Sequence, residues 1–303
     1  MKAIEGIITA MVTCFRNDGA LDLPAMRASV RHLIASGAGG LCPLGGTGEP
    51  LSLTVDEHKQ VIDAVVHEAA GRVPVVIGTL LARQEDIVEC GRHAKSAGAD
   101  AIMVIPPYFI NTKPAHTRAH FQTIAERVDM PMVLFHGPGR SGVRLSADAI
   151  LELLLAVPSL VAIKETSGDL AICAELLRSA PRGFRVLQGF DEYVLPTLAL
   201  GGHGAVLSLG ALVPALLRKL HNAFAAGRLD EAQQIQLSLL PLCSVIYGEP
   251  NPGPLKVALA MAGRPAGPTR RPIYPVSKET IACLEQLCPD ISRAESAAGH
   301  ARD

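Results

Sequence analysis

Short apolar stretches alternate with amphipathic segments along most of the chain, and this alternation predicts repeated strand–helix pairs. Near-continuous apolar strands are typical of a parallel sheet that is covered by helices on both faces. Eight such pairs predict a closed (β/α)₈ barrel, the TIM-barrel fold. The predicted strands are residues 6–13, 37–44, 74–78, 99–105, 131–135, 160–164, 184–187 and 205–209.

Two of the predicted helices begin with recognisable capping signals. Asp22 followed by Pro24 supplies a cap and a first-turn proline. Thr54 and Glu57 have the spacing of a capping box, in which each side chain bonds the backbone N–H of the other residue. Further helices are expected over residues 84–97, 115–127, 147–155 and 170–179.

The alternation ends after Pro214, where only helices are predicted: residues 216–226, 229–242, 254–262 and 278–287. We expect a helical extension packed on the barrel and not a second catalytic domain. The predicted division is a barrel over 1–222, a C-terminal helical region over 223–291, and a frayed tail of small and charged residues over 292–303.

Composition narrows the class of protein. The net charge is −1 without a basic run, so neither nucleic acid nor an anionic membrane is an expected partner. No apolar run approaches the ~18 residues of a spanning helix, and the first residues do not resemble a signal peptide. The seven cysteines are scattered without CxxC spacing, which favours reduced thiols in a cytoplasmic protein and neither a disulfide framework nor a metal site.

Lys164 ends the apolar run Leu160–Ile163 and is the first candidate for chemistry. One interpretation is an ordinary strand end whose ammonium reaches solvent. The other is a lysine buried in the barrel, where desolvation lowers the pKa of the amine. A neutral lysine amine attacks ketones and forms a Schiff base.

Other polar groups follow neighbouring strands, and chemistry in this fold sits at the carboxyl ends of the strands. The turn 45–49 (Gly-Gly-Thr-Gly-Glu) offers the Thr47 hydroxyl and backbone N–H groups to a carboxylate, and it lacks the lysine of a nucleotide-binding P-loop. Arg140 lies in a Pro/Gly loop and is suited to bidentate carboxylate recognition. Together with Lys164, these groups predict a 2-keto acid as ligand.

The same motifs carry a resemblance to a known family. The segments 45–49, 107–108, 138–142, 163–169 and 251–254 resemble, in order, motifs of the dihydrodipicolinate synthase / N-acetylneuraminate lyase family. The resemblance implies a TIM barrel, a homotetramer built as a dimer of dimers, and class I aldolase or lyase chemistry on pyruvate-like substrates without a cofactor. It implies that Lys164 forms the Schiff base and that Thr47 and Val206 contact the keto acid, with Gly46, Arg140 and Gly189 as further substrate-binding positions.

The chain departs from the family pattern at its proton carriers. The synthases use a threonine and two tyrosines, where this chain has Gly46, Phe109 and Phe135. None of these side chains carries a proton, so we expect a divergent member that is not a housekeeping enzyme of lysine biosynthesis. Tyr108 and His136 are candidate substitutes, although strand alternation turns His136 away from Phe135.

Three functions remain open from the sequence. The first is a Schiff-base lyase or aldolase acting on pyruvate or a related 2-keto acid. The second is a 2-keto-acid dehydratase resembling the 5-dehydro-4-deoxyglucarate dehydratases, a branch that Gly46 and the run 106–108 also resemble. The third is a keto-acid-binding protein that has lost turnover.

Overall fold

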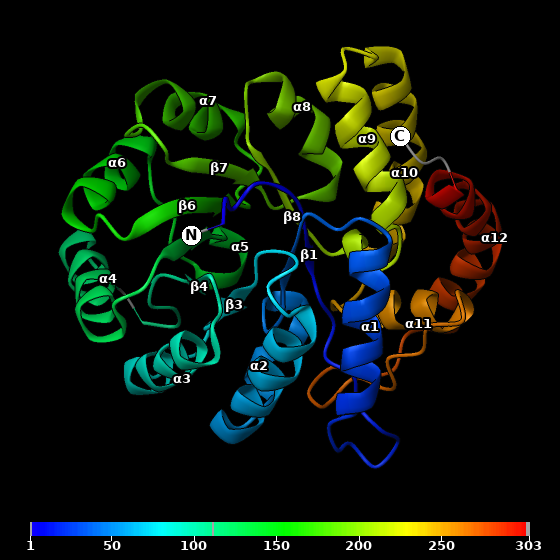
Figure 1. Cartoon of the computed structure of the whole chain (residues 1–303), viewed down its shortest axis with the longest axis horizontal. Coiled ribbons are helices and arrows are strands. Elements are labelled where there is room, and N and C mark those ends of the chain that lie inside the picture. The colour runs from blue at the N-terminus through cyan, green and yellow to red at the C-terminus, as the bar shows by residue number, and fades with distance from the viewer. Residues whose placement is uncertain (1, 111, 301–303) are drawn as a thin grey trace.

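The computed structural model describes residues 2–110 and 112–300 and contains an eight-stranded parallel barrel (Figure 1). The strands follow the order β2-β1-β8-β7-β6-β5-β4-β3, and a bridge between Leu41 and Val75 joins the two ends of this order. The TIM-barrel prediction is therefore confirmed. The strands are β1 (Gly6–Ala10), β2 (Gly40–Cys42), β3 (Val76–Gly78), β4 (Ala101–Val104), β5 (Met132–His136), β6 (Leu160–Glu165), β7 (Arg185–Gln188) and β8 (Gly204–Leu207).

Helices surround the barrel, and their starts follow the capping signals in the sequence. Asp22 caps the first helix by accepting from Ala25 N, and Thr54 and Glu57 form the predicted capping box. Two short helices were not predicted, because neither is long enough to show a helical period: α5 (Pro138–Ser141) and α8 (Val194–Ala199). The other helices of the barrel are α1 (Leu23–Ala35), α2 (Val55–Ala69), α3 (Gln84–Ala97), α4 (Pro114–Val128), α6 (Ala147–Ala156) and α7 (Leu170–Ser179).

The strands divide their side chains between two separate apolar clusters. Successive side chains of a strand point to opposite faces. On β5, Phe135 joins the cluster inside the barrel, and Leu134 joins the larger cluster between the barrel and its helices. On β6, Ala162 lies inside and Ile163 outside, so the alternation turns Lys164 inward.

The C-terminal region packs on one side of the barrel (Figure 1). Glu295 of the last helix accepts hydrogen bonds from two backbone N–H groups at the start of α9 (Pro214–Ala225). They are Ala215 N at 2.9 Å and Leu216 N at 2.8 Å. The last helix reaches His300, so residues 292–300 are helical and not frayed as predicted, because this contact holds them; residues 301–303 lie outside the described part. The helices are α9 (Pro214–Ala225), α10 (Leu229–Tyr247), α11 (Gly253–Met261) and α12 (Lys278–His300).

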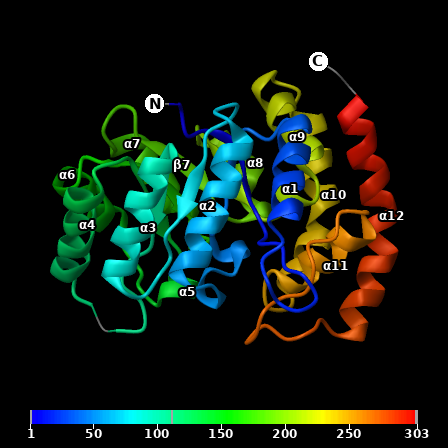
Figure 2. The same ribbon diagram turned by 60° about the horizontal axis from the view of Figure 1, so that its bottom comes forward.

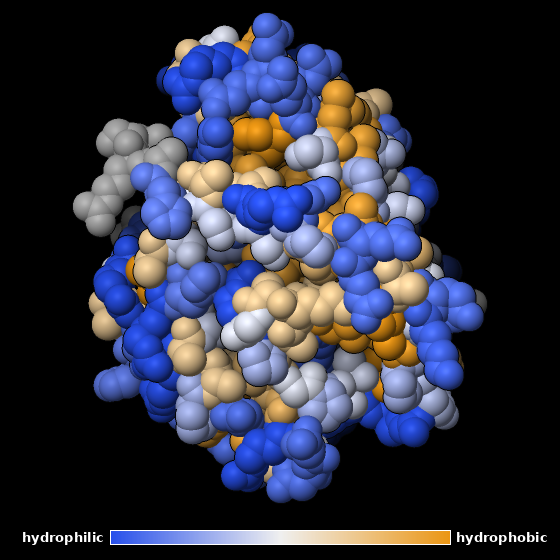
Figure 3. Space-filling view, turned by 90° about the vertical axis from the view of Figure 1, so that its right-hand side faces the viewer, coloured by the Kyte–Doolittle hydropathy of each residue, from blue (hydrophilic) through white to orange (hydrophobic). Residues whose placement is uncertain are grey.

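The face that carries these C-terminal helices mixes hydrophobic and strongly hydrophilic residues (Figure 3). Leu229 and Leu237 of α10 are both more than half exposed. Among the described residues, no helix is both long and apolar enough to cross a membrane.

Candidate active site

Lys164 lies inside the barrel near the carboxyl end of β6 and is 7% exposed. Burial lowers the pKa of its amine because the charged form is desolvated, and the nearby Arg140 guanidinium lowers it further. Cys42 and Asp191 raise the pKa, each by less than burial lowers it, and the Arg140 effect is the smallest of the four. The solvent-exposed interpretation of this lysine is therefore wrong, and the amine has the environment of a nucleophile.

Phe135 is the neighbour of Lys164 across the β5–β6 pair. Its ring centroid lies 5.0 Å from Lys164 Nζ, within the range of a cation–π contact. The ring shields the amine from water but offers it no hydrogen-bonding group. The position that the resemblance assigns to a tyrosine thus lies beside the lysine, without a hydroxyl.

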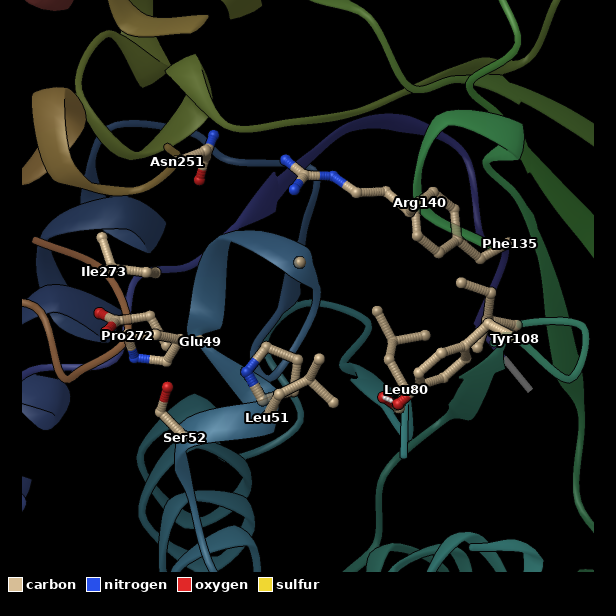
Figure 4. A pocket seen from close by; sticks show the side chains of 13 residues that line it. Glu49, Leu51, Ser52, Leu80, Tyr108, Phe135, Arg140, Asn251, Pro272 and Ile273 are labelled. Carbon is tan, nitrogen blue, oxygen red and sulfur yellow. Dashed lines mark hydrogen bonds between the residues drawn. The ribbon is translucent and has the colours of Figure 1, made fainter. Parts of the chain in front are cut away.

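A cavity of about 300 Å³ opens at this end of the barrel (Figure 4). Its walls come from the loops after several strands and from the segment between α11 and α12. Figure 2 shows that α5 and this late segment lie at the same end of the molecule, opposite the N-terminus. The lining residues are Gly46, Glu49, Pro50, Leu51, Ser52, Leu80, Ile105, Tyr108, Phe135, Arg140, Asn251, Pro272 and Ile273.

The glycine-rich turn after β2 forms one wall of the cavity. Gly46 lines the cavity, and the next residue, Thr47, is buried with its hydroxyl 2.7 Å from the hydroxyl of Ser208. The Asn251 amide also donates to Ser208, at 3.3 Å. The turn itself is held by Thr13, whose hydroxyl donates to Gly48 O at 2.6 Å.

Two further predicted positions lie on β8 and just after β7. Val206 is buried inside the barrel with Phe135. Gly189 is sterically required, because a β-carbon there would lie 1.9 Å from Thr166 Oγ1 and 3.0 Å from Lys164 Cε. The absence of a side chain at Gly189 keeps the space beside the lysine stem open.

Arg140 projects from α5 toward Asn251 across the cavity (Figure 4). It lines the cavity and is also exposed to solvent. Its charge acts on Lys164. An arginine at this place can attract an anionic ligand and favours the neutral form of the lysine.

The two candidate substitutes for the missing tyrosine lie in different environments. Tyr108 lines the cavity and donates to Leu80 O at 3.3 Å, and burial raises its pKa. His136 lies behind the cavity on the outer face of β5, where Glu165 and Leu145 N contact both ring nitrogens. Phe109 is fully exposed and is not among the cavity residues.

A buried ion pair at the cavity wall was not predicted. Glu49 and Lys256 are 2.7 Å apart, and both side chains are almost completely buried. Lys256 also lies 4.5 Å from the ring centroid of Phe15, and burial lowers its pKa. Glu49 belongs to the glycine-rich turn 45–49, but nothing in the sequence pairs it with a lysine so far along the chain.

A second polar pair without a sequence signal joins the turn after β7 to α10. The Tyr247 hydroxyl donates to Asp191, which also accepts from Leu209 N at 3.2 Å. Burial raises the pKa of the Asp191 carboxyl to about 6. Burial and the neighbouring Asp191 carboxylate both raise the pKa of the Tyr247 phenol.

Comparisons with known proteins agree with one another. The Dihydrodipicolinate synthetase family model matches residues 3–289. A 4-hydroxy-tetrahydrodipicolinate synthase of Maridesulfovibrio salexigens is 38% identical over 281 residues, which are 93% of this chain and 96% of the relative. The synthase of Methanothrix thermoacetophila is also 38% identical, over 95% of this chain and 97% of the relative. The solved structure of the synthase from Methylacidiphilum fumariolicum SolV superposes with a TM-score of 0.93 at 28% identity, over 98% of this chain and 99% of that one.

Proposed function

The chain belongs to the dihydrodipicolinate synthetase family, and on that basis we propose that Lys164 forms a Schiff base with pyruvate or a related 2-keto acid. The observation that carries the proposal is the buried lysine, whose lowered pKa favours the nucleophilic neutral amine. No cofactor is needed for this step. The family membership makes the protein a class I aldolase or lyase.

The ligand is positioned by groups on three sides of the lysine. The backbone N–H groups of Thr47 and its turn bind the carboxylate, which leaves the Thr47 hydroxyl with Ser208, and Arg140 contacts the carboxylate or a distal polar group. Gly189 and Val206 bound the space in which the keto carbon meets Lys164 Nζ. Attack of the amine on this carbon and loss of water give a protonated imine, which accepts electrons when a neighbouring bond breaks.

The reaction after imine formation has two candidates. The relatives are named 4-hydroxy-tetrahydrodipicolinate synthase, which makes that synthesis the first activity to assay. Phe135 favours a second candidate, another aldol or dehydration reaction of a 2-keto acid, because the ring beside Lys164 cannot carry a proton as the tyrosine of the synthases does. The alternative that the assays must exclude is a protein that binds a keto acid without converting it.

Assembly is a further part of the proposal. The resemblance implies a homotetramer, and the tip of the loop after β4 is unusually apolar for an exposed surface. Phe109 is fully exposed, and Ile110 is 61% exposed. Burial of this tip against a second subunit would remove both side chains from water, and sedimentation of the purified protein measures the assembly.

Borohydride reduction in the presence of pyruvate tests the Schiff base. We expect a stable adduct on the peptide that carries Lys164, and no adduct there in Lys164→Ala. Lys59→Ala, which removes a partly exposed lysine away from the cavity, is the matched control and should label as the wild type does. An adduct that persists on Lys164→Ala would refute the assignment.

Turnover is then measured with the substrates of the synthase and with a panel of 2-keto acids and aldehydes. Product formation that disappears in Lys164→Ala supports an enzyme and rejects the binding protein. Thermal stabilisation by pyruvate without any product supports the binding protein.

A further inference from the structure

A line of hydrogen-bonding groups leads from the cavity wall into the protein. Thr47 and Ser208 are joined at 2.7 Å, and either hydroxyl can donate. The Ser208 hydroxyl lies close enough to the phenol of Tyr247 to act on its pKa, which it lowers. Tyr247 in turn donates to Asp191 Oδ2. The line thus begins with the hydroxyl of Thr47, the residue after the cavity-lining Gly46, and ends at a buried carboxylate.

Tyr247 is distinguished among the four tyrosines of the chain. Tyr193 and Tyr274 are exposed, at 39% and 67%. Tyr108 lines the cavity but donates to a backbone carbonyl, which cannot accept a proton. Tyr247 alone among these described residues contacts a carboxylate.

We propose that Tyr247 and Asp191 carry the proton for which Phe135 has no hydroxyl, through Ser208 and Thr47. This inference rests on the Schiff-base function proposed above. It makes Tyr247 and Asp191 relay residues that act through Thr47 and do not touch the substrate. Their position on α10 and just after β7 gives the C-terminal region a part in the chemistry.

The relay accounts for every proton and electron pair in the step that turns the imine into an enamine. The C3–H bond of the bound keto acid breaks, and its electrons form the C2–C3 double bond while the C=N π electrons move to Lys164 Nζ. The C3 proton goes to Thr47 Oγ1, and Thr47 passes its own proton to Ser208. Ser208 passes one to Tyr247, which passes one to Asp191, so that the net result is a protonated carboxyl group. The reverse transfers return the proton when the new bond has formed.

The charges around Asp191 suit a group that takes up and releases a proton. Lys164 of β6 faces it and stabilises the carboxylate, whereas Glu192 beside it has the opposite effect. From α10, Tyr247 donates to it and Cys243 lies near it. With burial, these groups bring the pKa of Asp191 to about 6, so the carboxylate that accepts the proton is present above this pH and is lost below it.

Exchange of the pyruvate methyl protons in D₂O tests the relay without a second substrate, because exchange requires the enamine. We expect Tyr247→Phe to retain the borohydride adduct on Lys164 and to lower the exchange rate about 10²-fold or more. Wild-type exchange should fall as the pH drops through about 6, and the residual exchange of Tyr247→Phe should lack this dependence. Ser208→Ala should lower exchange in the same way and provides a second break in the line.

Tyr193→Phe and Tyr108→Phe are the matched controls for loss of a phenol hydroxyl. Tyr193→Phe should exchange at the wild-type rate. The relay is refuted if Tyr247→Phe exchanges as fast as Tyr193→Phe, if Tyr108→Phe alone abolishes exchange, or if the wild-type protein forms the adduct but does not exchange. Absence of an adduct in the wild-type protein would instead refute the Schiff-base function.

Discussion

His136 Nδ1 lies 2.5 Å from Glu165 Oε2, directly behind Phe135 and Lys164 on the outer face of the same two strands. Leu145 N donates to the other ring nitrogen, so that nitrogen is an acceptor and Nδ1 carries the hydrogen that Glu165 accepts. The pair joins the ends of β5 and β6 without reaching the cavity. His136 is therefore a positioning residue and does not replace the missing tyrosine.

His136→Leu should lower the free energy of unfolding by about 2–4 kcal/mol, because it leaves the Leu145 N–H without its acceptor and one oxygen of the buried Glu165 carboxylate without its donor. Denaturant unfolding measures the change. His93→Leu is the control, since the His93–Asp63 pair is partly exposed and should contribute less than about 1 kcal/mol. A pH profile of methyl exchange that differs from the wild type in His136→Leu would contradict a purely positioning role.

Phe135→Tyr should raise the rate of the synthase reaction by about 10²–10⁴-fold if proton transfer beside Lys164 limits it. The new hydroxyl would enter the site from a ring whose centroid is 5.0 Å from the amine. Steady-state kinetics with the synthase substrates measure the gain, and Phe109→Tyr is the exposed control. An unchanged rate would show that the missing hydroxyl is not what limits this enzyme.

Lys256→Met should lower the free energy of unfolding by about 3–5 kcal/mol, because it leaves the Glu49 carboxylate buried without its cation. The double variant Glu49→Gln/Lys256→Met should recover much of the loss, since no buried charge then remains unpaired. Lys59→Met, at a partly exposed pair, should change stability by less than about 1 kcal/mol. A double variant no more stable than Lys256→Met would argue against this account.

Glu57 binds Arg270 of the segment between α11 and α12 through two hydrogen bonds of 2.6 and 2.8 Å. These bonds are the main cause that lowers the pKa of Glu57 from 4.5 to about 2. A lowered pKa of an acid stabilises the fold above its unfolded pKa, and this stability is lost as the pH falls from 4.5 toward 2. Glu57→Gln should therefore cost about 1–3 kcal/mol at pH 7 and progressively less toward pH 3.

Glutamine retains the capping function of position 57, so the Glu57→Gln comparison isolates the charge. Unfolding curves at several pH values give the difference between variant and wild type. A difference independent of pH between 3 and 7 would contradict the assignment to ionisation. Glu89→Gln, at a partly exposed pair with Lys59, should show little change.

The sequence predicted the barrel because this fold is visible in local order, whereas the apolar run before Lys164 left two interpretations open and the family resemblance assigned the lysine to the Schiff base. Apolar strands repeat along the chain, and alternation within β6 alone decides which way Lys164 points. Alternation also predicted that His136 faces away from Phe135, and the contacts of His136 confirm it.

Contacts between distant segments could not be predicted in this way. Tyr247 and Asp191 are 56 positions apart, and Arg270 and Glu57 are 213 apart. Each pairing depends on how the C-terminal helices lie against the barrel, which no local pattern encodes. The buried pair of Glu49 and Lys256 was missed for the same reason, because its lysine comes from α11.

The segment that supplies Pro272 and Ile273 to the cavity has a consequence for folding during synthesis on the ribosome. Every barrel strand has been synthesised by Leu207, yet this wall of the cavity is encoded far downstream. A nascent chain can thus complete its sheet well before it has a finished ligand pocket. Pyruvate would then bind fully only to chains in which the segment with Pro272 and Ile273 has already packed against the barrel.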